Sequence, residues 1–286
     1  MIRRTKDMHG VSRFALLLAL VMLLTGVCAC AEDSAPQASE GTPAADVIRS
    51  WVKKEDWQYL QLGQYMYEKD GTMAPVLWRV LFVEDGKALM ITEHVIDLCQ
   101  PYFMDTKKDY DFYKEYKHKS RLPELTSIEE TEVPGWFANV MWPVLIGDDP
   151  IGSAFVDEGS GRLFLMPTSE WCRTEYGFTK KKGDAPNPSR IAQVTPYVRY
   201  KRMYDWSSRM VLYEKGYTGS CYWTSDMRPG ERRMQIVGIN GHLSWGGWIR
   251  PNVGVRPAAK LDLKDIRIVS GSGTAKDPFV VSYAGE

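Results

Sequence analysis

Residues 252–263 read Asn-Val-Gly-Val-Arg-Pro-Ala-Ala-Lys-Leu-Asp-Leu, a pattern typical of a buried β-strand with one arginine, Arg256, inside it. A guanidinium keeps its charge at any physiological pH. Burying that charge without partners costs a large amount of free energy. The surroundings of Arg256 therefore bear on the fold of the protein more than on its activity.

Similar short runs occur from residue 57 to the end of the chain and predict further strands. Asp85-Gly86 and Asn240-Gly241 stand between such runs, and both dipeptides are typical of tight hairpin turns. Helical patterns are few: residues 136–146, which Pro143 would cut, and a helix start at residues 168–171. The predicted strands are residues 59–67, 76–83, 87–92, 162–166, 221–225, 234–239, 242–245, 266–269 and 279–282. The predicted class is α+β, with mainly antiparallel β-sheets, a few short helices and long loops.

The composition argues against some classes of function. The chain has 286 residues, of which 44% are apolar and 25% charged, and this is ordinary for a soluble globular protein. Its 36 basic and 36 acidic residues balance, which argues against a general nucleic-acid binder. The 10 Trp and 15 Tyr exceed what a core needs, so some of them are candidates for a stacking surface.

Residues 1–29 resemble a bacterial lipoprotein signal peptide. A basic segment leads into residues 14–27, an apolar run shorter than the about 20 residues that span a bilayer. Val27-Cys28-Ala29-Cys30 resembles a lipobox, with valine where leucine is commoner, so Cys30 is the predicted lipidation site. Acyl chains on Cys30 would hold the protein on the extracellular face of the bacterial cell membrane. Plain secretion is the alternative, since Ala29-Cys30-Ala31 also fits a small-x-small cleavage site.

Residues 30–56 are predicted to form a flexible tether. Much of this segment is rich in Ala, Ser, Pro and Gly and has no apolar periodicity, so it cannot bury enough surface to become ordered. The remaining part of the chain, residues 57–286, is predicted to form one domain.

Several motifs in that domain occur together and in one order: LGQY at 62–65, LWRVL at 77–81, ALMI at 88–91, FLM at 164–166, RIAQVTPY at 190–197, YWTS at 222–225, GVRPA at 254–258 and GSGTAKDP at 271–278. Together they resemble a widespread bacterial family known as a domain of unknown function. Residues 136–157 fit this family poorly, and YWTS differs from its usual Trp-Leu-Arg-Ser. The family resembles the C-type-lectin-like fold that formylglycine-generating enzymes share, so the resemblance implies a C-type-lectin-like domain.

The resemblance also implies a role for Arg256. Along an extended strand, Val253 and Val255 would face one side, and Gly254, Arg256 and Ala258 the other. On that second face Arg256 would donate hydrogen bonds to carbonyls or a carboxylate of neighbouring loops, which makes it a structural residue. Contact with a ligand is the alternative.

No catalytic residue is predicted. Formylglycine-generating enzymes use cysteines, but Cys172 and Cys221 match no catalytic motif of that kind. With Cys99 they are the three cysteines left after lipidation; an extracellular location permits a disulfide, the pairing stays open, and buried thiols are the alternative. The sequence lacks the acidic loops of calcium-dependent lectins, zinc-ligand spacing and a phosphate-binding glycine loop. Neither a metal nor a cofactor is therefore expected.

A ligand is expected at aromatic loops beside the last strands, where C-type-lectin-like folds usually bind. Indole faces and arginine donors are combined there, although core packing of the tryptophans is the alternative. The candidate ligand-binding residues are Trp206, Arg228, Trp245, Trp248 and Arg250. The predicted function is a surface-anchored, non-enzymatic binding module of the bacterial cell envelope, with a cell-wall glycan, a peptide or a protein as ligand and no nucleic acid. The alternatives are a formylglycine-generating-enzyme-like oxidoreductase and a purely structural envelope protein.

Overall fold

The computed structural model describes residues 41–53, 55–97, 137–157, 159, 161–179, 185–203, 219–227, 233–248 and 253–285. Within these residues the chain forms mainly antiparallel strands, a few short helices and long connecting segments. The predicted α+β class is therefore confirmed. None of the helices in this part of the chain is long and apolar enough to cross a membrane.

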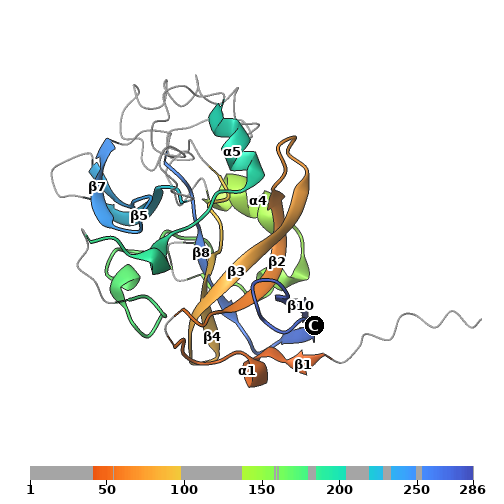
Figure 1. Ribbon diagram of the computed structural model, residues 1–286. Helices are drawn as coiled ribbons and strands as arrows, with labels where there is room; N and C mark the ends of the chain where they lie inside the picture. The colour runs from red at the N-terminus through yellow and green to blue at the C-terminus, as the bar shows by residue number, and fades with distance from the viewer. Residues whose placement is uncertain are drawn as a thin grey trace, which may run out of the picture. The chain divides into compact units, whose positions relative to one another are not determined.

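The larger of two sheets has seven strands in the order β1-β9-β10-β2-β3-β4-β8 (Figure 1). Neighbouring strands are antiparallel except β10 and β2, which run parallel. The strands are β1 (Thr42–Pro43), β2 (Gln58–Met66), β3 (Met73–Glu84), β4 (Lys87–Thr92), β8 (Ala258–Asp262), β9 (Ile266–Ser270) and β10 (Phe279–Tyr283). The strand that ends the described chain thus lies beside β2, where Phe279 is opposite Leu60.

The hairpin of β3 and β4 turns at Asp85-Gly86, as the sequence predicts. Asp85 has a φ angle of 50° and Gly86 one of 73°, so both residues adopt the left-handed conformation that a type I′ turn requires. The resulting register places Arg79 of β3 opposite Ile91 of β4. It also places Glu93, just after β4, beside β3. There the Glu93 N–H donates to the carbonyl of Leu77 at 2.8 Å.

The smaller sheet contains β5 (Tyr222–Met227), β6 (Arg233–Val237) and β7 (Leu243–Trp248), all antiparallel. The hairpin predicted at Asn240-Gly241 is present, but its loop is longer than a two-residue turn, because the strands end at Val237 and resume at Leu243. Figure 1 shows β8 between this sheet and β2 and β3 of the larger sheet.

Both faces of the larger sheet are buried in its middle strands. In β4, Ala88 and Met90 belong to one hydrophobic cluster, whereas Leu89 and Ile91 belong to a second. Because successive side chains of a strand point to opposite faces, an unbroken apolar run such as this one indicates cover on both sides. The second cluster includes Trp171, which contacts the buried residues Arg190 and Arg256 described below.

The helices are all short. The pattern at residues 136–146 forms a π-helix and an α-helix in succession, and the helical backbone passes through Pro143 because this residue lies in the first turn of α4, where its missing N–H is not needed. The elements are α1 (Ala44–Val47), η2 (Phe137–Met141), α4 (Trp142–Leu145), η3 (Pro150–Ala154), η4 (Glu170–Cys172), η5 (Pro188–Arg190) and α5 (Pro196–Met203).

Two predicted strands are shorter than expected. Of the opening stretch, only Ala258–Asp262 joins the sheet as β8, while Gly254 and Val255 form single bridges. Residues 162–166 contribute one bridge, between Phe164 and Ala258. Both stretches are held by single backbone hydrogen bonds to separate segments, such as that from the Val255 N–H to the carbonyl of Asp97 at 2.8 Å, instead of a continuous ladder.

The folded unit begins before the predicted boundary at residue 57, so the tether predicted for residues 30–56 is too long. Thr42 pairs with Ile268 of β9. Three residues spaced four apart are buried, with 0, 5 and 6% of their surface exposed: Ala44, Ile48 and Val52. No local pattern indicates this order, because these isolated apolar residues are buried by distant segments.

Candidate functional site

The residues predicted to bind a ligand or a lipid lie largely outside the described part of the chain. Cys30, Trp206, Arg228 and Arg250 are not described, and neither is Cys99. Trp245 and Trp248 are placed by their backbone only, on β7, where they are opposite Gln235 and Arg233 of β6. The binding surface proposed from these residues therefore stays a prediction.

Arg256 is buried, with 1% of its surface exposed. Its Nε donates to the carbonyl oxygen of Thr92 at 2.6 Å, and its Nη1 donates to the hydroxyl of Tyr222 at 3.2 Å. The guanidinium also lies 5.5 Å from the ring centre of Trp171 and 5.2 Å from that of Tyr222. Arg256 thus contacts the end of β4, the start of β5 and η4 at once.

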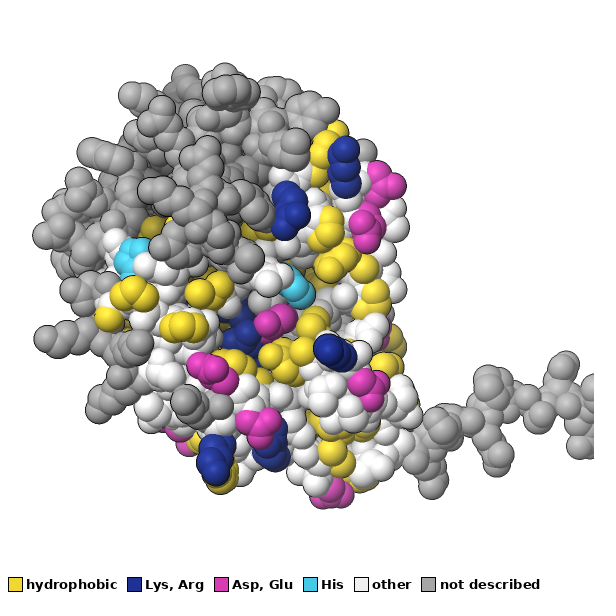
Figure 2. Space-filling view, viewed as in Figure 1, with side chains coloured by type: hydrophobic (Ala, Val, Ile, Leu, Met, Phe, Trp, Pro, Cys, Tyr) yellow, Lys and Arg dark blue, Asp and Glu magenta, His cyan; other side chains and the backbone are white. Residues whose placement is uncertain are grey.

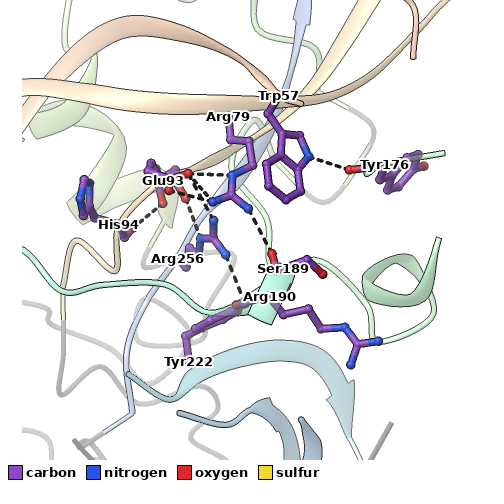
Figure 3. Close-up of polar contacts among 10 residues, drawn as sticks. Trp57, Arg79, Glu93, His94, Tyr176, Ser189, Arg190, Tyr222 and Arg256 are labelled. Atoms are coloured by element: carbon purple, nitrogen blue, oxygen red, sulfur yellow. Dashed lines mark hydrogen bonds and ion pairs between the residues drawn. The ribbon is translucent and has the colours of Figure 1, made fainter. Parts of the chain in front are cut away.

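A second buried arginine, Arg79 of β3, belongs to the same polar cluster, which consists of Arg79, Glu93, Arg190, Tyr222 and Arg256, and forms the shorter of the two ion pairs that Glu93 makes in it (Figure 3). Its Nε and Nη2 each donate to the carboxylate of Glu93 at 2.7 Å, which is the forked geometry that an arginine prefers. Its Nη1 donates to the carbonyl of Ser189 at 3.2 Å, and its guanidinium stacks 4.0 Å from the ring centre of Trp57. The sequence signal for this residue is an arginine inside the apolar run LWRVL, a pattern that does not by itself indicate its partners.

Arg190 is the third buried arginine, with none of its surface exposed. Its Nε donates to the carbonyl of Trp171 at 2.7 Å and its Nη1 to that of Gly241 at 3.2 Å. Its Nη2 donates to Cys172 Sγ at 3.4 Å, and Cys172 and Cys221 are not joined by a disulfide. The Tyr222 hydroxyl donates to the carbonyl of Arg190 at 2.5 Å and so connects it to Arg256.

Glu93 is the carboxylate that Arg79 and Arg256 share. Its Oε2 lies 2.6 Å from Nη2 of Arg79 and 4.0 Å from Nη2 of Arg256. Burial by itself would raise the pKa of Glu93, but the two arginines outweigh burial and hold this pKa below its usual value. Nη2 of Arg256 has no hydrogen-bond partner among the described residues. Because the Glu93 carboxylate lies 4.0 Å from it, the negative charge of Glu93 also balances this guanidinium.

His94 follows Glu93 and lies at the edge of the cluster. Burial lowers the pKa of His94, and the charges of Arg256 and Arg79 lower it further against the opposing effect of Glu93. The imidazole therefore favours its neutral form, in which one ring nitrogen donates a hydrogen bond and the other accepts one. Its ring meets that of Tyr67 edge-on, with 6.4 Å between the ring centres and 86° between the planes.

A groove of about 350 Å³ opens beside His94 on the larger sheet. Its polar groups include Gln61, His94 and Thr195, and its apolar wall includes Leu77 and Pro278. Figure 2 shows basic, acidic and histidine side chains close together near the middle of the view, with hydrophobic side chains beside them. An apolar groove with a few polar groups at its edge is the usual form of a small-ligand site.

The Glu93 carboxylate beside His94 is paired with Arg79, and Tyr65, which lines the groove, donates its hydroxyl to Asp97 at 2.8 Å. The described residues contain no group of three or more His, Cys, Asp or Glu side chains placed to hold a metal ion. No family model, no curated protein and no solved structure matches this chain. The geometry of the site is therefore the basis for a functional proposal.

Proposed function

We propose that this protein is a surface-anchored, non-enzymatic binding module of the bacterial cell envelope. The anchor is a lipid on Cys30, the folded unit adopts a C-type-lectin-like fold, and a ligand enters the groove beside His94. The mixed strand order and the structural use of Arg256, in the motif GVRPA, support the proposed fold. The lipobox-like sequence at residues 27–30 supports the anchor.

The groove carries the proposal of binding. It is lined by apolar side chains with a few neutral hydrogen-bonding groups, among them the Gln61 amide and the Thr195 hydroxyl. Such a surface can orient a ligand through hydrogen bonds and exclude water from its apolar part. The Arg79–Glu93 pair beside it, with Arg79 only 4% exposed, holds β3 and the end of β4 together and so keeps the groove in shape.

The test uses the full-length protein on an array of defined cell-wall glycan and peptide fragments. Leu77→Asp places a charge in the apolar wall of the groove, and Gln61→Ala removes the side-chain amide from its lining. Val144→Asp is the matched control, because Val144 is 38% exposed and lies on α4 outside the groove. The expected result is that both groove variants lose a fragment that the wild type and the control retain.

Two results would contradict the proposal. One is that no fragment binds, which would favour a purely structural protein, or that a bound fragment is retained equally by all variants, which would place the ligand outside this groove. The other is turnover of a thiol-containing substrate that depends on Cys172 or Cys221, which would favour the enzyme. Mass spectrometry of the native N-terminus tests the anchor, and an unmodified chain that begins at Glu32 would exclude it.

A further inference from the structure

Among the tryptophans whose side chains the structure describes, Trp51 is unusual because 58% of its surface is exposed. Trp78, Trp171 and Trp223 are at most 2% exposed, and Trp57 and Trp142 are half-buried. A large apolar side chain is normally withdrawn from water, since its burial contributes about 1.5–3 kcal/mol. A single exposed apolar residue is ordinary, but an exposed indole that lines a groove is a candidate contact for a ligand.

The main chain on both sides of Trp51 is fixed. The carbonyl of Ser50 accepts a hydrogen bond from the N–H of Val83 at 3.2 Å. The N–H of Val52 donates to the carbonyl of Glu175 at 3.4 Å, and the Val52 side chain is buried. The exposed indole therefore projects from a held segment, so little conformational entropy is lost when a ligand packs on it.

An open groove of about 610 Å³ lies beside Trp51. The buried residues Val52 and Phe178 contribute to its lining, together with the side chains of Thr174, Thr179 and Lys53. Hydroxyl and ammonium groups beside an aromatic face provide hydrogen-bond donors and acceptors around an apolar platform. This groove shares no lining residue with the one beside His94.

The charges in this groove favour an uncharged ligand. Lys53 and Glu175, its two ionisable lining residues, have opposite charges. Glu175 also accepts a hydrogen bond from Arg173 Nε at 2.7 Å, and Arg173 lies 3.1 Å from Glu170 on its other side. These four charges balance, so the residues that the structure describes here offer no net charge to attract an anion or a cation.

The backbone beside the groove argues against an added peptide strand. The N–H of Val52 is bonded to Glu175, and the N–H of Glu55 donates to the carbonyl of Gly177 at 3.2 Å. A peptide that extends a sheet needs unpaired backbone groups on one edge, and these two groups are already used. A ligand that relies on ring stacking and side-chain hydrogen bonds fits better.

We propose that this groove binds a neutral oligosaccharide, with the apolar face of one pyranose ring stacked on the indole of Trp51. The side chains of Thr174 and Lys53 then form hydrogen bonds with its hydroxyl groups, and Thr179 Oγ1, which donates to Asn187 Oδ1 at 2.7 Å, accepts one from the sugar. The site goes beyond the proposed function, because it is separate from the groove beside His94 and does not depend on a ligand there.

The experiment measures binding of cellohexaose and of hexa-N-acetylchitohexaose to the full-length protein by isothermal titration calorimetry. Trp51→Ala should weaken binding at least about tenfold, which corresponds to about 1.4 kcal/mol, whereas Trp51→Tyr, which keeps an aromatic face, should stay within about threefold. Val144→Ala, at another exposed apolar residue, should bind like the wild type. Thermal melting checks that each variant is folded.

Three outcomes would overturn the inference: neither oligosaccharide binds, Trp51→Ala binds as tightly as the wild type, or a proline-rich peptide binds at Trp51 in place of both sugars. If Leu77→Asp abolishes sugar binding and Trp51→Ala does not, the sugar lies in the groove beside His94. That result would contradict this inference and support the proposed function, so the two failures are distinguishable.

Discussion

Replacing Glu93 with glutamine should lower the free energy of unfolding by about 2–4 kcal/mol. The variant keeps the size of the side chain but removes the negative charge between Arg79 and Arg256. Both guanidiniums would then remain buried with fewer compensating groups, since Arg79 is 4% exposed and Arg256 1%. The cost arises from those uncompensated charges and not from lost packing.

The magnitude follows from the geometry of the pair. Arg79 donates two hydrogen bonds at 2.7 Å to Glu93, and hydrogen bonds to charged groups contribute about 1.5–3 kcal/mol each. Breaking a fully buried ion pair costs about 3–5 kcal/mol. The Glu93 side chain is 22% exposed, so water moderates the loss and the expected value falls to about 2–4 kcal/mol.

Urea denaturation of the full-length protein, followed by tryptophan fluorescence, measures the difference. Asp56→Asn is the matched control, because the Arg49–Asp56 pair is as short, 2.5 Å, but its side chains are 45 and 65% exposed. An exposed pair contributes at most about 1 kcal/mol. Equal destabilisation by the two variants would refute the argument that burial makes the Glu93 pair costly to break.

Acid provides a second check on the same residue. The pKa of Glu93 in the folded protein lies below the ordinary value of 4.5. The unfolded chain therefore takes up a proton first as the pH falls, and the stability that Glu93 contributes above pH 4.5 is lost as the pH falls through its folded pKa. The difference in the free energy of unfolding between wild type and Glu93→Gln, measured by urea denaturation, should consequently narrow in acid.

Two further predictions concern the neighbouring residues. The pKa of His94 is lowered from 6.5, so the unfolded chain binds more protons just below that pH and the stability of the wild type should fall as the pH drops through 6.5. His94→Gln should lack this slope when urea midpoints are measured across the same range, and an identical slope would assign the effect to another group. Arg256→Ala should destabilise the protein by about 2–4 kcal/mol because it strands the Thr92 carbonyl, and Arg256→Lys should recover only part of this. Thermal melts measure both variants; an unchanged melting temperature with loss of a bound ligand would make Arg256 a contact residue.

Much of the strand layout can be predicted from local sequence patterns. The alternation of residues 59–67 and the apolar run of residues 87–92 each correspond to a strand, since side-chain periodicity is fixed by the backbone. Asp85-Gly86 specifies its turn because few residues adopt a positive φ without strain. Even the need of Arg256 for partners is evident from the sequence, because its charge cannot be removed.

The identity of those partners was decided only by the tertiary structure. Arg256 and the Thr92 carbonyl are 164 residues apart, and Arg79 and the Ser189 carbonyl are 110 apart. No local pattern encodes which acceptors meet a given guanidinium, because the choice depends on how the strands are ordered and which loops cover them. The burial of Ala44 and the exposure of Trp51 could not be predicted from the sequence for the same reason. Whether a side chain is exposed to water depends on all the segments packed around it.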